Sequence, residues 1–267
     1  MNSKLLFVML ISAFFIQSDL LAQTGQEANE YFSKLLEPFD DIEKRKWAYL
    51  RTVTRGKSAR KVDKKRQNLL KEYEAFQNHV RAVRTLRGDT ILKPAIKDYL
   101  KTTIIVIKQD YDKILDMEAI AEDSYDLMEA YLLAQELAQE KLSDAIDLLQ
   151  EAQQSFCLAN DILLMEAESD KRQEKIKNAS NLLEYYNKAY LIFFKPYKQE
   201  AYVLDAFSRN DVTSMEQHNN ALIDMSEESL ESINALENYN GDGELKSAIV
   251  NIINFYKTEA EEDFGVM

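Results

Sequence analysis

Without a single glycine or proline, the chain reads SYDLMEAYLLAQELAQEKLSDAIDLLQEAQQSFCLANDILLMEAES from Ser124 to Ser169. Within this stretch apolar residues recur in alternating steps of four and three, the spacing of a coiled-coil seam. The seam consists of Ala138, Leu142, Ala145, Leu149, Ala152, Phe156, Ala159 and Leu163. Because alanine alternates with leucine or phenylalanine, a neighbouring helix can approach closely on the alanine side. The pattern predicts one long helix that forms the spine of a bundle.

The rest of the chain also has few residues that end helices. Its 267 residues include six glycines and three prolines. The long runs between them are rich in leucine, alanine, glutamate, lysine and glutamine, which favour helix. We therefore predict an all-α fold, an elongated bundle of about six or seven helices around the long central helix.

The N-terminal segment 1–22 has the pattern of a secretory signal peptide. Lys4 supplies the positive charge, residues 5–16 form an apolar core, and Leu20-Leu21-Ala22 is a cleavage site before Gln23. An uncleaved anchor is the alternative, although the apolar core is short for a membrane span. We expect residues 23–267 to form a single helical domain that is exported and has no transmembrane segment.

The chain contains one cysteine, Cys157, beside the apolar seam. An exported chain with one cysteine cannot form an internal disulfide. We expect Cys157 to act as a small apolar side chain, with an intermolecular disulfide as the alternative.

A short pattern, G-D-x-x-L-K-x-A-I, occurs at residues 88–96 and again at 241–249. Each copy follows an amphipathic helix and, before that, an aromatic-rich helix interrupted at Pro38 or Pro196. The order of parts predicts duplicated three-helix halves, 23–123 and 169–267, joined by the helix 124–168. The alternative is two ordinary helix starts, each capped by aspartate after a glycine.

Charge divides the chain in the same way. Residues 44–101 hold 18 Lys or Arg against five Asp or Glu, whereas residues 199–263 hold three against 15, and the whole chain carries −13. A basic stripe along the predicted helix from Ser58 to Leu86 is a candidate site for an anionic partner. Its residues are Lys57, Arg60, Lys61, Lys64, Lys65 and Arg66. Alternatively, the basic half simply balances the acidic half.

Motifs for catalysis are missing from the sequence. Its two histidines, His79 and His218, stand outside any metal-binding or nucleophile motif and are expected to be exposed and inert. Residues 238–243 resemble half a calcium loop, but Ile249 stands where a glutamate is needed, so a turn is expected. We predict no enzyme activity, no cofactor and no metal. An acidic chain without a recognition module also argues against nucleic acid as a partner.

Aromatic residues concentrate between positions 185 and 207. A subset at helical spacing is a candidate pocket for a small apolar ligand, although such spacing is more often typical of a core. The candidate pocket residues are Tyr186, Tyr190, Phe193, Tyr197 and Tyr202.

Three segments, GKSARKV (56–62), MEAIAEDSYDLMEAYLLAQE (117–136) and YLIFFKPYKQEAYVLDAF (190–207), resemble an uncharacterised group of exported helical proteins of Bacteroidota, sometimes labelled surface proteins. The resemblance implies the periplasm or the outer surface of a diderm bacterium and carries no catalytic residue. We expect a non-catalytic interaction or scaffold protein of the cell envelope, whose partner is an envelope component or protein. The alternative is a periplasmic carrier or sensor of a small apolar ligand.

Overall fold

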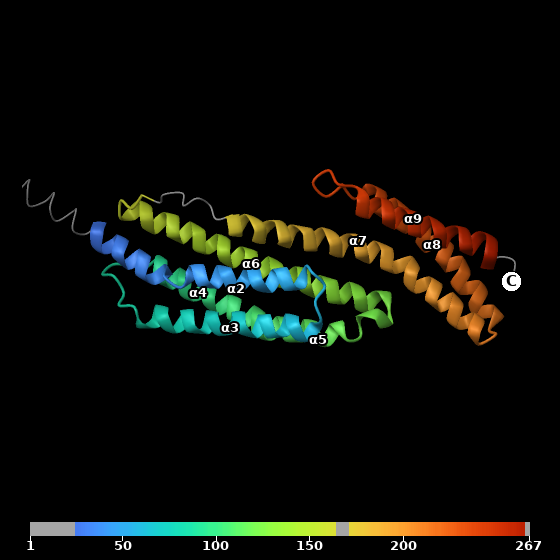
Figure 1. Ribbon diagram of the computed structural model, residues 1–267, viewed down its shortest axis with the longest axis horizontal. Coiled ribbons are helices and arrows are strands. Elements are labelled where there is room, and N and C mark those ends of the chain that lie inside the picture. The colour runs from blue at the N-terminus through green and yellow to red at the C-terminus, as the bar shows by residue number, and fades with distance from the viewer. Residues whose placement is uncertain (1–24, 164–170, 265–267) are drawn as a thin grey trace, which may run out of the picture. The chain divides into compact units, whose positions relative to one another are not determined.

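The computed structural model describes residues 25–163 and 171–264, which form helices joined by turns, with no β-strand within these ranges (Figure 1). The predicted all-α fold is confirmed. The chain divides into two compact units. Unit 1 contains residues up to Gln109 together with Gln139–Ile176, and unit 2 contains Asp110–Ala138 together with the residues from Lys177 onward. The predicted signal peptide lies outside the described residues.

Unit 1 is a set of helices around one continuous core. Its elements are a helix at residues 25–36, α2 (Phe39–Val53), α3 (Ala59–Ala82), α4 (Leu92–Ile105), most of the π-helical segment η1 (Val106–Asp110) and the second half of α6 (Tyr125–Ala159). Leu35, Phe76 and Ile96 are fully buried in this core. Phe156 of α6 contacts the rings of Tyr31 and Phe32, with centroids 5.9 and 6.2 Å apart.

Unit 2 has three smaller cores among its described residues. Its elements are α5 (Tyr111–Glu118), the short η2 (Ala121–Asp123), the first half of α6, most of α7 (Lys171–Ser208), α8 (Val212–Ala235), α9 (Glu244–Thr258) and the π-helical segment η3 (Glu259–Asp263). Two of the cores join α7, α8 and α9, around Val203 and Ile253 respectively. The third joins α6 to α7 around Phe194.

The long central helix is shorter than its sequence predicts. Ala138, Ala145 and Phe156 of the seam are buried as expected, but α6 ends at Ala159, and Leu163 is 90% exposed. The helix stops because Asp161 adopts a left-handed conformation, with φ of 53°, which aspartate tolerates better than most residues. The predicted helical residues 164–169 lie outside the described residues.

The two prolines expected to interrupt helices behave differently. Pro38 separates the helix at residues 25–36 from α2, as predicted. The sequence predicts a kink or a joint at Pro196. Pro196 stands inside α7, which continues without a break to Ser208, so there is no joint between two helices at this position. Buried residues on both sides of the proline, Ala189 and Val203, hold α7 against α8 and α9, so tertiary packing outweighs the lost backbone donor.

The two units repeat one local structure. Helices α3 and α8 both have 24 residues. Helix α3 starts at Ala59 and α8 starts at Val212, while η1 starts at Val106 and η3 starts at Glu259. The number of residues between the two starts is the same in both pairs. We call this interval the repeat spacing, and it supports the predicted duplication. The halves are nevertheless composed differently from the prediction, because residues 110–123 belong to unit 2 and the second half of α6 belongs to unit 1.

The repeated G-D-x-x-L-K pattern has the same role in both units. Gly88 and Gly241 have φ of 89° and 84°, values that glycine adopts without strain. The aspartate that follows each glycine accepts hydrogen bonds from backbone amides at the start of α4 and of α9. Lys93 donates to the carbonyl of Val83 at the end of α3, and Lys246 donates to that of Leu236 at the end of α8. One short motif therefore ends one helix and starts the next. As expected, residues 238–243 form a turn.

Candidate anion-binding surface

The candidate surface begins at the turn between α2 and α3. Gly56 takes the left-handed conformation, with φ of 57°, and its amide donates to the carbonyl of Val53, which closes the turn. Ser58 then starts α3 without a side-chain cap, and the first turn of α3 contains no acidic residue. The positive end of the helix dipole is therefore not offset locally by a carboxylate.

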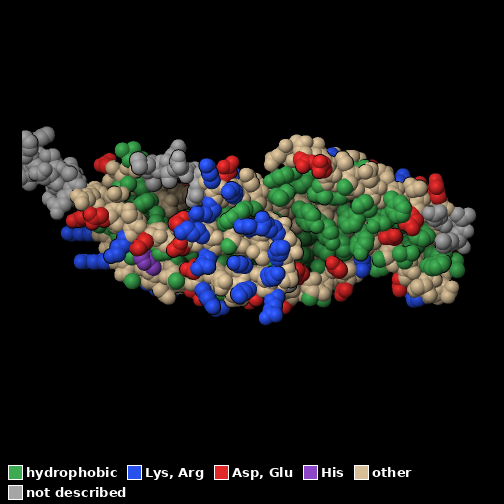
Figure 2. Space-filling view, viewed as in Figure 1, with side chains coloured by type: hydrophobic (Ala, Val, Ile, Leu, Met, Phe, Trp, Pro, Cys, Tyr) green, Lys and Arg blue, Asp and Glu red, His purple; other side chains and the backbone are tan. Residues whose placement is uncertain are grey.

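Five of the six predicted residues are exposed here, and we call them the basic surface: Lys57, Arg60, Lys61, Lys64 and Lys65. Within the described residues, none of these five side chains forms a hydrogen bond or an ion pair. Figure 2 shows Lys and Arg side chains gathered over the part of unit 1 that contains α2 and α3. Cationic groups are therefore available to an external anion.

The sixth predicted residue, Arg66, does not belong to this surface. Its side chain is buried, its Nη2 donates to Asp63 at 2.7 Å, and its Nη1 donates to the carbonyl of Ile107 at 2.8 Å. Arg66 stands one position beyond the exposed stripe, on the core side of the helix. The prediction for Arg66 is wrong, because the charge satisfies groups inside unit 1.

Some other cations of unit 1 are paired within it. Lys44 bonds to Asp40 at 2.7 Å, Arg172 bonds to the same aspartate at 2.6 Å, and Arg45 lies 3.3 Å from Glu72. The basic surface differs from these pairs because its cations follow one another closely along one helix start and have no bonded carboxylate among the described residues.

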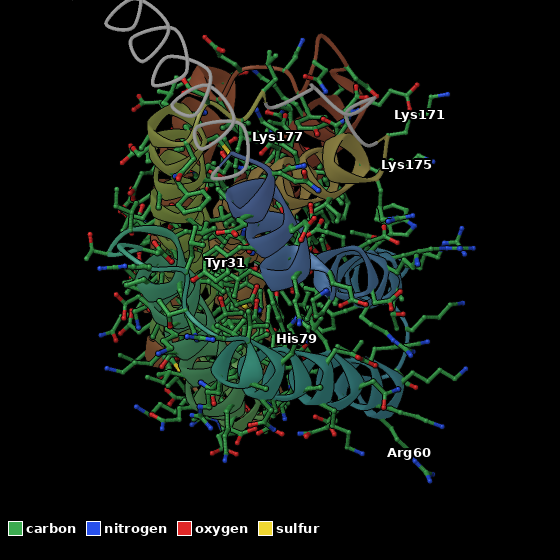
Figure 3. The ribbon with its side chains drawn as sticks, turned by 90° about the vertical axis from the view of Figure 1, so that its left-hand side faces the viewer. Tyr31, Arg60, His79, Lys171, Lys175 and Lys177 are labelled. Atoms are coloured by element: carbon green, nitrogen blue, oxygen red, sulfur yellow. The ribbon has the colours of Figure 1, made fainter. Side chains whose placement is uncertain are left out.

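Sequence reasoning missed further cations near this surface. Arg51 and Arg55 are exposed on the α2 side of the same turn. In Figure 3, Lys171 and Lys175 of unit 1 lie at the top of the view and Arg60 at the bottom, so these two lysines are separate from the basic surface. The charge run at residues 57–66 pointed to α3 alone and left out the arginines at the end of α2.

Such a surface can hold anions. Ammonium and guanidinium groups donate several hydrogen bonds each and match carboxylate or phosphate oxygens. Single exposed contacts are weak and screened by salt, with a Debye length of about 8 Å at physiological ionic strength. Several neighbouring cations are therefore needed to hold an anionic partner.

The aromatic candidates divide into two groups. Tyr186, Tyr190, Phe193 and Tyr197 form a row of ring contacts along α7, with neighbouring centroids 5.5 to 6.0 Å apart. Tyr202 stands apart from the row, since its ring contacts His218 at 5.5 Å and its hydroxyl donates to the Asp123 carbonyl. The rings of the row contact one another, and the structure does not assemble the five residues around one site.

Both histidines are half-buried and hydrogen-bonded, which corrects the expectation that they are exposed. His79 Nε2 donates to the Lys34 carbonyl at 2.6 Å, and Gln199 donates to His218 Nδ1 at 3.1 Å. Among the described residues, no group of three or more His, Cys, Asp or Glu side chains is arranged to hold a metal ion. The helices at residues 25–163 and 171–264 include none that is long and apolar enough to cross a bilayer.

Comparison with known proteins adds no assignment. No protein family, curated protein or solved structure matches this chain. What bears on function is therefore the arrangement of the chain's own residues.

Proposed function

We propose that this chain is an exported, non-catalytic binding protein of a bacterial envelope, which docks on an anionic envelope component through the basic surface. The observation that carries the proposal is the concentration of five exposed cations between Lys57 and Lys65, none of which has a side-chain partner among the described residues. The signal-like N-terminus and the resemblance to exported proteins of Bacteroidota supply the cellular setting.

The net negative charge of the chain restricts how it can bind an anionic surface. A chain with a net charge of −13 is repelled by anionic surfaces at long range, so binding to one requires a local cluster of cations. The alternative function, a carrier for a small apolar ligand, has less support, because the aromatic row on α7 contacts itself.

The test is retention of purified residues 23–267 on isolated bacterial envelopes. Retention that falls as salt rises, and that is competed by an added polyanion, supports the proposal. Absence of retention at low salt, with the protein shown to be folded by circular dichroism, would refute it.

A further inference from the structure

Unit 2 exposes a row of large apolar side chains along two adjacent helices. We call it the α7–α9 face; its residues are Tyr186, Tyr197 and Leu204 on α7 and Leu245, Ile252 and Phe255 on α9. Figure 2 shows apolar side chains gathered over this part of unit 2. Phe255 is 60% exposed and Tyr186 is 46% exposed. Contiguous exposed apolar surface of this kind marks interaction sites in folded proteins.

The two helices meet along their length. Ile249 and Ile253 of α9 share a core with Ala189 of α7, and Phe193 of α7 packs against it. Further along, Glu200 of α7 lies beside Glu259, just beyond the end of α9. The exposed residues therefore line the side of one helix pair within unit 2.

The repeat shows what covers the corresponding face in unit 1. At the repeat spacing, Leu92 and Tyr99 of α4 correspond to Leu245 and Ile252 of α9, yet Leu92 and Tyr99 are both buried. Tyr99 is covered by the rings of Phe39 of α2 and Tyr73 of α3, with centroids 6.4 and 6.2 Å away. Leu92 belongs to the core that also contains Ala145, Leu149 and Phe156 of α6, so the second half of α6 contributes to this core in unit 1.

The first helix of unit 1 also contacts α6. Its Phe32 stacks on Phe156 of α6, with ring centroids 6.2 Å apart. In unit 2 the ring of Tyr186 on α7 is half-exposed.

The first half of α6 does not fill this position in unit 2. Its buried residues Met128 and Leu132 share a core with Phe194 of α7, and among the described residues that core includes no member of α9. Within residues 25–163 and 171–264, α6 therefore shares no core with α9 in unit 2.

We propose that the α7–α9 face binds an amphipathic α-helix of another protein, with an alanine- and leucine-rich apolar stripe and basic flanks. The charge of unit 2 determines which charge the flanks of the bound helix should carry. In unit 1 the covering segment, residues 139–159, has four acidic residues and one lysine and lies in a basic unit. Unit 2 has the opposite charge beside the face: α9 and η3 together contain five acidic residues and two lysines, of which Lys257 is paired with Glu227 of α8. Glu200 of α7 adds another carboxyl group, so basic flanks are complementary to this side of unit 2.

The charges also argue against a second copy of this chain as the occupant. The exposed leucines of α6, such as Leu137 and Leu148, alternate with Glu140, Asp144 and Glu151 along the helix. Placing this surface, or a second α7–α9 face, on acidic unit 2 brings like charges together.

The test uses two peptides that share one apolar stripe. The first is residues 139–159 with C157S, and the second adds E140K, D144K, D147K and E151K. Binding to the purified full chain is measured by fluorescence anisotropy. We expect the basic peptide to bind and the acidic peptide to bind at least about tenfold more weakly. Equal affinity of the two peptides, or no binding by either, would overturn the proposal.

Two variants of the protein locate the site. We expect Phe255→Glu to weaken the basic peptide at least about tenfold, and Leu148→Glu, similarly exposed on α6 in unit 1, to leave the affinity unchanged. Non-specific attraction predicts the opposite for Phe255→Glu, because the added negative charge would strengthen it. Concentration-dependent dimerisation that Phe255→Glu abolishes would assign the face to a second copy and overturn the proposal. These peptide-binding results do not depend on whether the basic surface of unit 1 binds an envelope component.

Discussion

Arg66 Nη1 donates a hydrogen bond of 2.8 Å to the carbonyl of Ile107 inside η1, and the second unit repeats this arrangement. There, Asn219 Nδ2 donates to the carbonyl of Ala260 inside η3 at 2.9 Å. The two donors are separated by the repeat spacing, and so are the two acceptors. A π-helical turn displaces backbone carbonyls from their usual donors, so a buried side chain from the neighbouring helix can satisfy one of them. Residues of different size and charge therefore perform one structural task.

Removing either donor leaves a buried carbonyl unsatisfied. We expect Arg66→Met and Asn219→Leu each to lower the free energy of unfolding by about 1–3 kcal/mol. Urea denaturation measures the loss, and hydrogen exchange should show the amides of η1 or η3 opening selectively. Lys64→Met, an exposed change on the same helix as Arg66, is the control and should cost less than about 0.5 kcal/mol. Equal stability of R66M and K64M would contradict this account.

The repeated lysine stabilises a helix end. Lys246 donates to the carbonyls of Asn234 and Leu236 at 2.8 and 2.7 Å, where α8 ends. We expect Lys246→Met to lower stability by about 1 kcal/mol, because two terminal carbonyls lose their charged donor. The melting temperature should fall relative to that of the exposed control Lys175→Met. Identical melting temperatures would show that water replaces the lysine without cost.

The contribution of Glu200 to the stability of unit 2 should increase as the pH falls below neutrality. Burial raises the pKa of Glu200, and the neighbouring Glu259 raises it further. Because the folded pKa exceeds the unfolded value of about 4.3, the folded state binds the proton more tightly. Its contribution is complete below that unfolded value and is lost as the pH rises through the raised pKa.

Glu200→Gln should remove this dependence. We expect the variant to be more stable than the parent at neutral pH and to show a flatter profile of melting temperature between about pH 4.3 and 7. Glu216→Gln, at an exposed position of α8, should leave the profile unchanged. Parallel profiles for the parent and E200Q would contradict the assigned pKa shift.

The cysteine should react slowly in the native protein. Cys157 is buried in the core of unit 1, and burial raises the pKa of its thiol. Since the thiolate is the reactive form, Ellman's reagent should label native protein far more slowly than protein in urea. Rapid labelling without denaturant would place Cys157 at the surface and restore the alternative of an intermolecular disulfide.

Sequence periodicity predicted the fold class and most helices, because a core-facing stripe is visible in a chain with few glycines and prolines. It failed at helix ends and at Pro196, where the outcome depends on tertiary packing. Nothing in the local pattern distinguishes Pro38, which separates two helices, from Pro196, which a packed helix accommodates. The repeated motif at Gly88 and Gly241 was visible in sequence, whereas its common hydrogen bonds required the structure.

The candidate surface was predictable in part. The run of Lys and Arg at residues 57–66 predicts a positively charged surface, and helical spacing separates Arg60 and Lys64 from the apolar face of the helix. Arg66 was misassigned because its acceptor, the Ile107 carbonyl, belongs to a π-helical turn that no residue pattern announces. The exposure of Ile252 and Phe255 on α9 was likewise not predictable, because isoleucine and phenylalanine at helical spacing are typical of a core.

The basic surface is the proposed docking site for an anionic envelope component. This docking is tested by comparing binding to isolated envelopes, across a salt series, of the parent chain and two variants with equal charge change. One reverses Lys57, Arg60, Lys61 and Lys64 to Glu; the other reverses the exposed Arg84, Arg87, Lys97 and Lys101. The account predicts that only the first variant loses salt-sensitive binding. Equal loss in both variants, or no loss in either, would contradict it.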